Sequence, residues 1–422
     1  MSILWMDFFE RKEKMKQEII EKYAELIVRT GANVQKGQYV VIRTGVFEED
    51  FAATVAKECY KAGAKRVFIH WQSAKLDLVD NRYADEEALK EVPLFEEEAH
   101  RFMLEKLPVL IWLDGDNPDG QNGLDNDKAA RIRKARHAIL GKYRDQRENH
   151  FQWVIAGVPS LPWAKKIFPD LPDEEAIEAL WEKILYTSRA LDGNGIENWK
   201  KHNEDLKKKC AYLNSLRLKK LTYHSSNGTD FWVSLIPGVR FEGGDEKTLE
   251  GVVYSPNIPS EECFTSPKKG EAEGIVYATK PLCYQGQMIE NFSIRFHEGK
   301  AVEVHAEKGQ EALESILHLD EGSAYLGECA LVPYHSPINL TNILFFNTLY
   351  DENAACHLAL GTGFSNLYPD FEKYTDEQIR GFGINYSLSH VDFMIGSKDM
   401  EIKGTKEDGS KVLIFKDGDW AF

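Results

Sequence analysis

Several absences in the sequence exclude common classes of protein. It contains no run of about 18 apolar residues, so we expect no membrane-spanning helix and no membrane partner. The formal net charge is −16, which argues against nucleic acid or an anionic membrane as the main partner. Neither a G-x-G-x-x-G segment nor a P-loop follows the first predicted strand, at residues 38–44, so we expect no nucleotide-phosphate site there.

Cysteine is scarce, and its spacing excludes two common roles. None of the six cysteines belongs to a C-x-x-C pair, which favours reduced thiols over a disulfide framework or a zinc knuckle. The opening run M-S-I-L-W-M-D-F-F is too short and wrongly flanked for a signal peptide, so we expect none. Together these features predict a cytoplasmic protein.

The length and the hydrophobic pattern predict two domains. At 422 residues the chain is too long for one ordinary core. A helix is predicted over residues 13–31. Buried strands at 38–44, 66–71, 108–114 and 152–157 alternate with helices at 49–62 and 126–146, which is typical of a parallel sheet. We therefore predict an α/β N-terminal domain with a parallel sheet and a helical linker, residues 1–215.

The pattern of predicted elements changes from alternating strands and helices to mostly strands after a charged helix predicted at residues 200–216. Short β-like runs separated by glycine turns recur at 221–224, 231–235, 275–279, 291–296 and 301–306. The stretch F-H-E-G-K at 296–300 indicates a hairpin, and a helical piece is predicted at 307–318. These patterns predict a β-rich α+β C-terminal domain, residues 216–422.

A second helical piece is predicted at residues 353–360. Asn353 is a favoured N-cap residue, and Gly361 is a favoured residue just past a helix end. This interpretation puts His357 one turn inside a buried helix, with Glu352 on the loop before it. By itself the segment is equally compatible with a capped core helix that carries one satisfied histidine.

Four segments of the second domain carry acids or histidines that can bind a metal. Glu328 lies in the apolar run L-G-E-C-A-L-V-P, and a lone buried carboxylate is costly unless it meets a metal or another cation. His390 and Asp392 are two residues apart and share one face of a predicted strand. The four segments are residues 258–265, 325–333, 351–361 and 389–396.

Glutamates, an aspartate and two histidines that converge on one cavity suit two divalent cations. Zinc or cobalt fits the ligand types, with manganese or magnesium as alternatives. Each residue taken singly also has an explanation without a metal, because Glu328 can pair with an arginine and His390 can be a core histidine. Spacing alone leaves both explanations open.

The same segments resemble the signature of a known family. The strings S-E-E-C-F-T-S-P, A-T-K-P-L, L-G-E-C-A-L-V-P, S-P-I, T-L-Y-D-E-N-A-A-C-H-L-A-L-G and S-L-S-H-V-D-F-M-I-G-S occur in this order. They resemble the aminopeptidase T / aminopeptidase S family of metallopeptidases. The resemblance implies that the metal ligands are Glu262, Glu328, Glu352, His357, His390 and Asp392 and that Glu328 bridges two metals. It also implies a homodimer whose C-terminal domain is catalytic.

The resemblance further implies an activity. The expected enzyme is a metal-dependent aminopeptidase that hydrolyses N-terminal residues from peptides with a free N-terminus, using a water activated by two cations. Glu352 is the expected catalytic residue, which takes the proton of that water and passes it to the leaving amine. Two alternatives remain: another metal-dependent amidase or hydrolase on the same site, and a catalytically impaired peptide-binding relative.

One position departs from the family pattern. Seven residues after His357, family members often carry a tyrosine near the metals, whereas this chain has Phe364. A phenol at this position can stabilise a tetrahedral intermediate, and a phenyl ring cannot. Another hydroxyl, from Tyr350, Tyr368 or Tyr386, is then needed, or the chemistry is altered.

Overall fold

The computed structural model describes residues 16–422, which divide into two compact units. Within this range, unit 1 comprises residues 16–202 and 245–259, and unit 2 comprises residues 203–244 and 260–422. The apolar run at the start of the chain and residues 13–15 of the first predicted helix lie outside the described residues.

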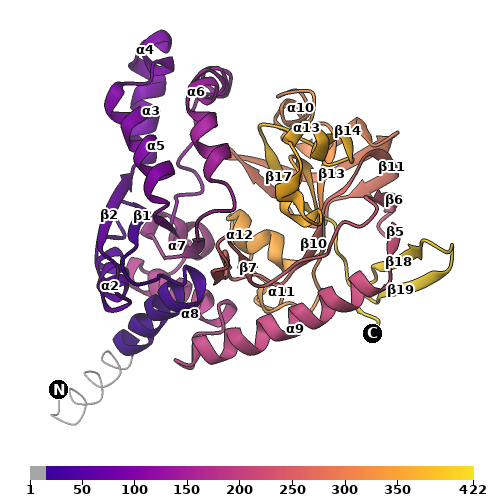
Figure 1. Cartoon of the computed structure of the whole chain (residues 1–422), viewed down its shortest axis with the longest axis horizontal. Helices are drawn as coiled ribbons and strands as arrows, with labels where there is room; N and C mark the ends of the chain where they lie inside the picture. The colour runs from indigo at the N-terminus through magenta and orange to yellow at the C-terminus, as the bar shows by residue number, and fades with distance from the viewer. Residues whose placement is uncertain (1–15) are drawn as a thin grey trace. The chain divides into compact units, whose positions relative to one another are not determined.

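Unit 1 is built on a parallel sheet with the strand order β2-β1-β3-β4-β9. Figure 1 shows β1 and β2 next to each other. Alternate residues of its central strands, such as Val40, Ile42, Val109 and Ile111, are fully buried. The predicted parallel sheet is therefore confirmed. The strands are β1 (Tyr39–Gly45), β2 (Arg66–Gln72), β3 (Val109–Asp114), β4 (Trp153–Gly157) and β9 (Asn257–Ile258).

Helices connect the strands of unit 1. Residues 16–26 are helical and continue into a π-helical turn, Ile27–Gly31, which confirms the first predicted helix over the described part of its range. Residues 245–259 add a two-stranded ladder, β7 (Glu246–Lys247) with β8 (Val253–Tyr254). The helices are α2 (Glu49–Lys61), α3 (Ala74–Tyr83), α4 (Glu86–Lys90), α5 (Leu94–Lys106), α6 (Asn126–Arg147), α7 (Leu161–Ile167) and α8 (Asp173–Thr187).

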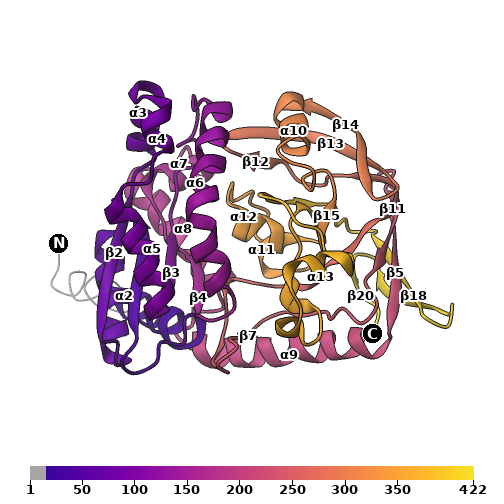
Figure 2. The ribbon, with the colours of Figure 1, turned by 45° about the horizontal axis from the view of Figure 1, so that its top comes forward.

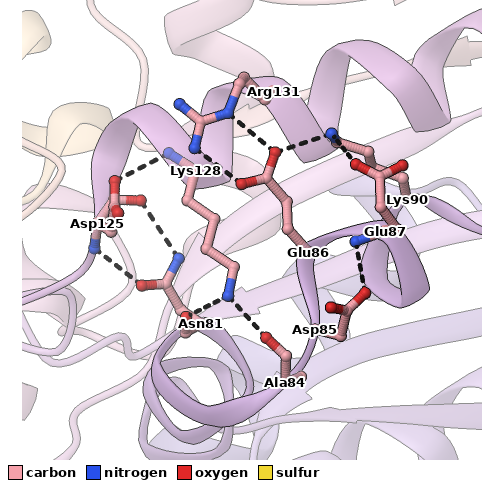
Figure 3. Close-up of polar contacts among 9 residues, drawn as sticks. All are labelled: Asn81, Ala84, Asp85, Glu86, Glu87, Lys90, Asp125, Lys128 and Arg131. Atoms are coloured by element: carbon pink, nitrogen blue, oxygen red, sulfur yellow. Dashed lines mark hydrogen bonds and ion pairs between the residues drawn. The ribbon is translucent and has the colours of Figure 1, made fainter.

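Polar contacts tie α3 and α4 to the start of α6 (Figure 3). The Asn81 amide accepts from Asp125 N–H at 2.8 Å and donates to Asp125 O at 3.2 Å. Arg131 makes a bidentate contact with Glu86, at 2.9 and 2.8 Å. Asn81 is buried, and its amide satisfies the N–H and the carbonyl of Asp125, the N-cap residue of α6.

Unit 2 contains a large antiparallel sheet that follows the order β12-β13-β11-β6-β5-β18-β19-β20, with β14 also paired to β13. Figure 2 shows β13 and β14 side by side with α10 (Gln310–Leu317) next to them. His297 pairs with Lys300 across the turn, which confirms the predicted hairpin. The strands are β5 (Leu218–His224), β6 (Asp230–Leu235), β11 (Pro267–Tyr277), β12 (Leu282–Tyr284), β13 (Gln287–His297), β14 (Lys300–Lys308), β18 (Glu401–Lys406), β19 (Lys411–Lys416) and β20 (Asp419–Trp420).

A smaller antiparallel sheet of unit 2 has the order β10-β15-β16-β17. Its strands are β10 (Cys263–Thr265), β15 (Leu326–Leu331), β16 (His357–Gly361) and β17 (His390–Met394). Short helices surround it: α11 (Pro337–Leu340), α12 (Thr348–Asp351), η2 (Glu352–Ala354), η3 (Ser365–Leu367), η4 (Phe371–Lys373) and α13 (Asp376–Gly381).

The helix predicted at residues 353–360 is wrong. Helix α12 ends at Asp351 and the 3₁₀ turn η2 that follows it ends at Ala354. His357–Gly361 form β16, a central strand in which every residue is buried. A short run of small apolar residues fits a buried strand as well as a buried helix, and pairing with β15 and β17 decides between them. His357 therefore opens a strand.

The domain boundary predicted at residues 215 and 216 stays a prediction. Helix α9 (Gly195–Ser215) begins in unit 1 and ends in unit 2. Residues 245–259 return to unit 1, because β9 pairs with β4. Across residues 16–422, no helix is long and apolar enough to cross a membrane.

Candidate metal centre

The six predicted ligands all lie in unit 2, on or beside the smaller sheet. Glu262 directly precedes β10, Glu328 lies within β15, and Glu352 begins η2; His357 opens β16, and His390 and Asp392 lie in β17.

The strand register brings these side chains to one face of the sheet. Glu328 is opposite Ala359, and Ala359 is opposite Asp392. His390 lies two residues before Asp392, and His357 lies two residues before Ala359, so both histidines share that face. Ligands from three adjacent strands thus surround one small side chain.

Small residues leave room above this face. His357 is opposite Ala330, and His390 is opposite Gly361. Positions 330, 359 and 361 therefore carry at most a methyl group between the ligand side chains. Larger residues at these positions would fill the space in which the ligand atoms meet.

The ligand atoms form two overlapping groups. Glu262, Glu328 and His357 offer atoms that lie within 4.8 Å of one another, and so do Glu328, His390 and Asp392. His357 Nε2 lies 3.2 Å from Glu262 Oε2, while His390 Nε2 lies 3.0 Å from Glu328 Oε2 and 3.2 Å from Asp392 Oδ1. Glu328 belongs to both groups, and its partner is a histidine rather than an arginine.

Both histidines turn Nε2 toward the centre and Nδ1 toward a backbone carbonyl. His390 Nδ1 lies 2.9 Å from Thr362 O, and His357 Nδ1 lies 3.3 Å from Ala355 O. A carbonyl on the far ring nitrogen fixes the ring orientation and is typical of metal-binding histidines. Carboxylate oxygens and imidazole nitrogens in this arrangement fit divalent cations.

Glu352 lies beside the two groups and belongs to neither. It lines a pocket together with Asp392, Pro281 and Met394. Asn353 Nδ2 donates to Glu352 Oε1 at 3.4 Å. The structure thus brings five predicted ligands together and places the sixth carboxylate on an adjoining wall.

Burial shifts the pKa values of the carboxyl groups. Burial raises the pKa of Glu328 to about 7; the His390 hydrogen bond opposes this rise, and the charges of Glu262 and Asp392 add to it. The pKa of Glu352 is raised well above its usual value by burial and by the charges of Asp392, Glu262 and Glu328. Carboxyl groups packed this closely hold protons at neutral pH unless another positive charge replaces them.

The two histidines supply part of that positive charge. Burial lowers the pKa of His357, but the hydrogen bond and charge of Glu262 outweigh this effect and raise the pKa to about 9. Asp392 and Glu328 likewise raise the pKa of His390 well above its usual value, against burial. Burial acts to raise the pKa of Asp392, yet contact with His390 lowers it overall. The centre is therefore a site that selects positive charge.

Phe364 lies against the metal centre. Its ring centroid is 5.2 Å from that of His390 and 5.2 Å from that of Phe264. Its backbone N–H donates to Ser266 Oγ at 2.8 Å, which holds the loop in place. The phenyl ring thus occupies the space beside a predicted ligand.

Two of the three tyrosines that could supply another hydroxyl stack on other rings, and the third lies under an arginine. Tyr350 stacks on Phe345, with ring centroids 4.7 Å apart. Tyr368 stacks on Phe382 at 4.6 Å, and the Arg380 guanidinium lies 3.8 Å above the Tyr386 ring. These contacts give no support to a hydroxyl that replaces the missing phenol.

Sequence reasoning missed two groups that hold the ligands. Asn353 was predicted to cap a helix, but it is fully buried and accepts from Glu261 N–H at 2.7 Å. A polar amide inside a run of small and apolar residues was the available signal. Thr362 acts through its carbonyl oxygen on His390, and no side-chain pattern reveals such a role.

Comparison with protein families finds one that covers almost the whole chain. The family described as "Thermophilic metalloprotease (M29)" matches residues 16–420.

Individual relatives agree with this match. The chain is 39% identical over 418 residues to aminopeptidase AmpS of Bacillus subtilis (strain 168), covering 99% of this chain and 100% of that protein. It is 39% identical over 404 residues to aminopeptidase 2 of Geobacillus stearothermophilus, covering 96% of this chain and 98% of that protein. The solved structure of wild-type AmpT from Thermus thermophilus matches with a TM-score of 0.87 and 36% identity, covering 96% of this chain and 100% of that chain.

Gly327 is needed for the orientation of His390. A Cβ at position 327 would stand 2.1 Å from Thr362 O, the carbonyl that contacts His390. We expect Gly327→Ala to lower the free energy of unfolding by about 2 kcal/mol or more and to weaken metal binding about 10-fold or more. Denaturant unfolding and metal titration measure both effects.

Gly381→Ala is the matched control, because a Cβ at Gly381 meets nothing within 4 Å. It should keep the stability and metal affinity of the parent protein. A Gly327→Ala protein with unchanged metal affinity would contradict the role given to the Thr362 carbonyl.

Metal affinity should rise with pH. For a cation held by Glu262, Glu328 and His357, both Glu328 and His357 carry protons that it must displace below about pH 7, and from about 7 to 9 His357 still does. Affinity should therefore increase by up to about 100-fold per pH unit below pH 7 and about 10-fold per unit up to pH 9. Competition with a chromophoric chelator at pH 6, 7, 8 and 9, corrected for the chelator's own protonation, tests this; a flat profile would contradict it.

Proposed function

The chain belongs to the thermophilic metalloprotease (M29) family and is a metal-dependent aminopeptidase; from this premise we propose that it removes N-terminal residues from peptides at the centre around Glu328. The observation that carries the proposal is the position of the Glu328 carboxylate, which belongs to both ligand groups. Two neighbouring cations need a ligand that bridges them, and a carboxylate shared by both ligand groups can do this.

We propose two divalent cations per chain, zinc or cobalt by ligand type, with manganese or magnesium as alternatives. Glu262, Glu328 and His357 would hold one, and Glu328, His390 and Asp392 would hold the other. When bound, such cations polarise the scissile carbonyl and lower the pKa of a water molecule toward neutrality.

The chain's own residues then handle the proton and the substrate. Glu352 lies outside both ligand groups and beside Asp392, so its carboxylate takes the proton of the attacking water and passes it to the leaving amine. This placement favours proton transfer over metal binding as its main role. The carboxylates around the centre also attract the free ammonium group of a peptide N-terminus.

The alternatives gain no support from the comparisons. The relatives described above are all named aminopeptidases. As the family resemblance implies, we also propose a homodimer. The six free cysteines, five of them buried, support the expected cytoplasmic location.

Glu328→Gln tests the proposed function. We expect loss of metal from the purified protein and a fall of ~1,000-fold or more in the hydrolysis of amino-acid p-nitroanilides, because both cations lose a shared ligand. Glu377→Gln, an exposed carboxylate of α13 in the same unit, is the control and should change neither quantity. N-blocked and ester analogues, assayed alongside, should be poor substrates. Full peptidase activity in Glu328→Gln would contradict the proposed function of the centre.

Phe364→Tyr tests whether the missing phenol limits the reaction. The ring contacts His390, so a hydroxyl added to it would stand near the centre and could donate to the developing oxyanion. We expect kcat to rise by about 10-fold, with KM and metal content nearly unchanged. An unchanged or lower kcat would show that the family's usual tyrosine has no catalytic role in this chain.

A further inference from the structure

A fully buried asparagine connects two of the segments that carry the predicted ligands. Asn353 has no exposed surface. Its Oδ1 accepts from Glu261 N–H at 2.7 Å, and its Nδ2 donates to Leu349 O at 2.9 Å and to Glu352 Oε1 at 3.4 Å. One amide thereby holds the backbone next to Glu262 and the side chain of Glu352.

The Glu262 segment is held from its other side as well. A Cβ at Gly243 would stand 2.2 Å from Glu262 O, so the backbones at these two residues are in close contact. Glu242 and Phe264 form a β-bridge beside them. The segment therefore lies between a backbone contact on one side and the Asn353 amide on the other.

The segment after Asn353 is equally constrained. Ser336 Oγ donates to Ala354 O at 2.9 Å, and Ala355 O faces His357 Nδ1 at 3.3 Å. Hydrogen bonds at Asn353, Ala354 and Ala355 thus hold the segment that runs from Glu352 to His357. Asn353 is the point at which this run meets the Glu262 segment.

We propose that Asn353 is a positioning residue, which holds the Glu262 ligand in place beside Glu352 and so sets the affinity of the centre for its cations. The proposal rests on the proposed function for the identity of the ligands. Its mechanism is geometric: loss of the amide frees two carboxylate-bearing segments to move apart. Groups that orient metal ligands typically contribute 10- to 100-fold in metal affinity or activity.

Unit 1 offers a matched control in Asn81 (Figure 3). Its amide also accepts from one backbone N–H and donates to one carbonyl, both of Asp125, and it is also buried. Asn81 lies in a different unit from the ligands. Loss of its hydrogen bonds should lower stability to a similar degree without touching the centre.

The experiment measures Zn²⁺ affinity by chelator competition, and the Tm of the metal-free protein, for Asn353→Ala, Asn353→Asp and Asn81→Ala. We expect about 10- to 100-fold weaker binding in both Asn353 variants and parental affinity in Asn81→Ala. Asn353→Asp keeps the acceptor for Glu261 N–H and loses both donations. An added carboxylate alone would strengthen cation binding, so weaker binding in this variant reports lost positioning.

Parental affinity in the Asn353 variants, with a lowered Tm like that of Asn81→Ala, would overturn the proposal and leave Asn353 a structural residue. If Asn353→Ala does not fold, Asn353→Asp decides. The two hypotheses fail separately. A parent protein whose Zn²⁺ affinity depends on Asn353 but which cleaves no peptide refutes the proposed function and supports the positioning role.

Discussion

Buried charge of one sign is the constraint on which the centre of unit 2 depends. Glu262, Glu328 and Asp392 are almost fully buried on one face of a four-stranded sheet, with Glu352 on the adjoining wall. A cluster of buried carboxylates is stable only when positive charge is buried beside it. Two histidines supply part of that charge, and protons or cations supply the rest. The small residues between the ligands and the carbonyls behind the histidines follow from the same requirement, since charge and counter-charge must meet without intervening atoms.

Much of unit 1 and the outline of the centre could be predicted from the sequence. The parallel sheet was readable because each strand is a short apolar run set off by an amphipathic helix. The convergence of ligands was suggested by isolated acids inside apolar runs, although each acid taken singly also had an explanation without a metal. The hairpin near His297 was readable from its turn chemistry alone.

What remained hidden depends on partners far away in the chain. His357 was placed in a helix because capping residues flank its segment, yet the hydrogen bonds of β15 and β17 make that segment a central strand. Strand β9, which lies beyond residue 250, joins the sheet of unit 1. No local sequence pattern predicts that this part of the chain pairs with β4. Backbone groups such as Thr362 O leave no trace in a residue pattern. In each case tertiary pairing outweighs local preference.

The return of residues 245–259 to unit 1 has a mechanical consequence. Strand β9 ends at Ile258, within the parallel sheet of unit 1, and Glu262 follows only four residues later in unit 2. The chain between them is a short tether with a proline at 259. Glu262 is therefore the predicted ligand with the shortest covalent connection to a strand of unit 1, whereas β15 and β17 lie much further along the chain. The contacts of its segment with Gly243 and Asn353 hold it within unit 2 despite this connection.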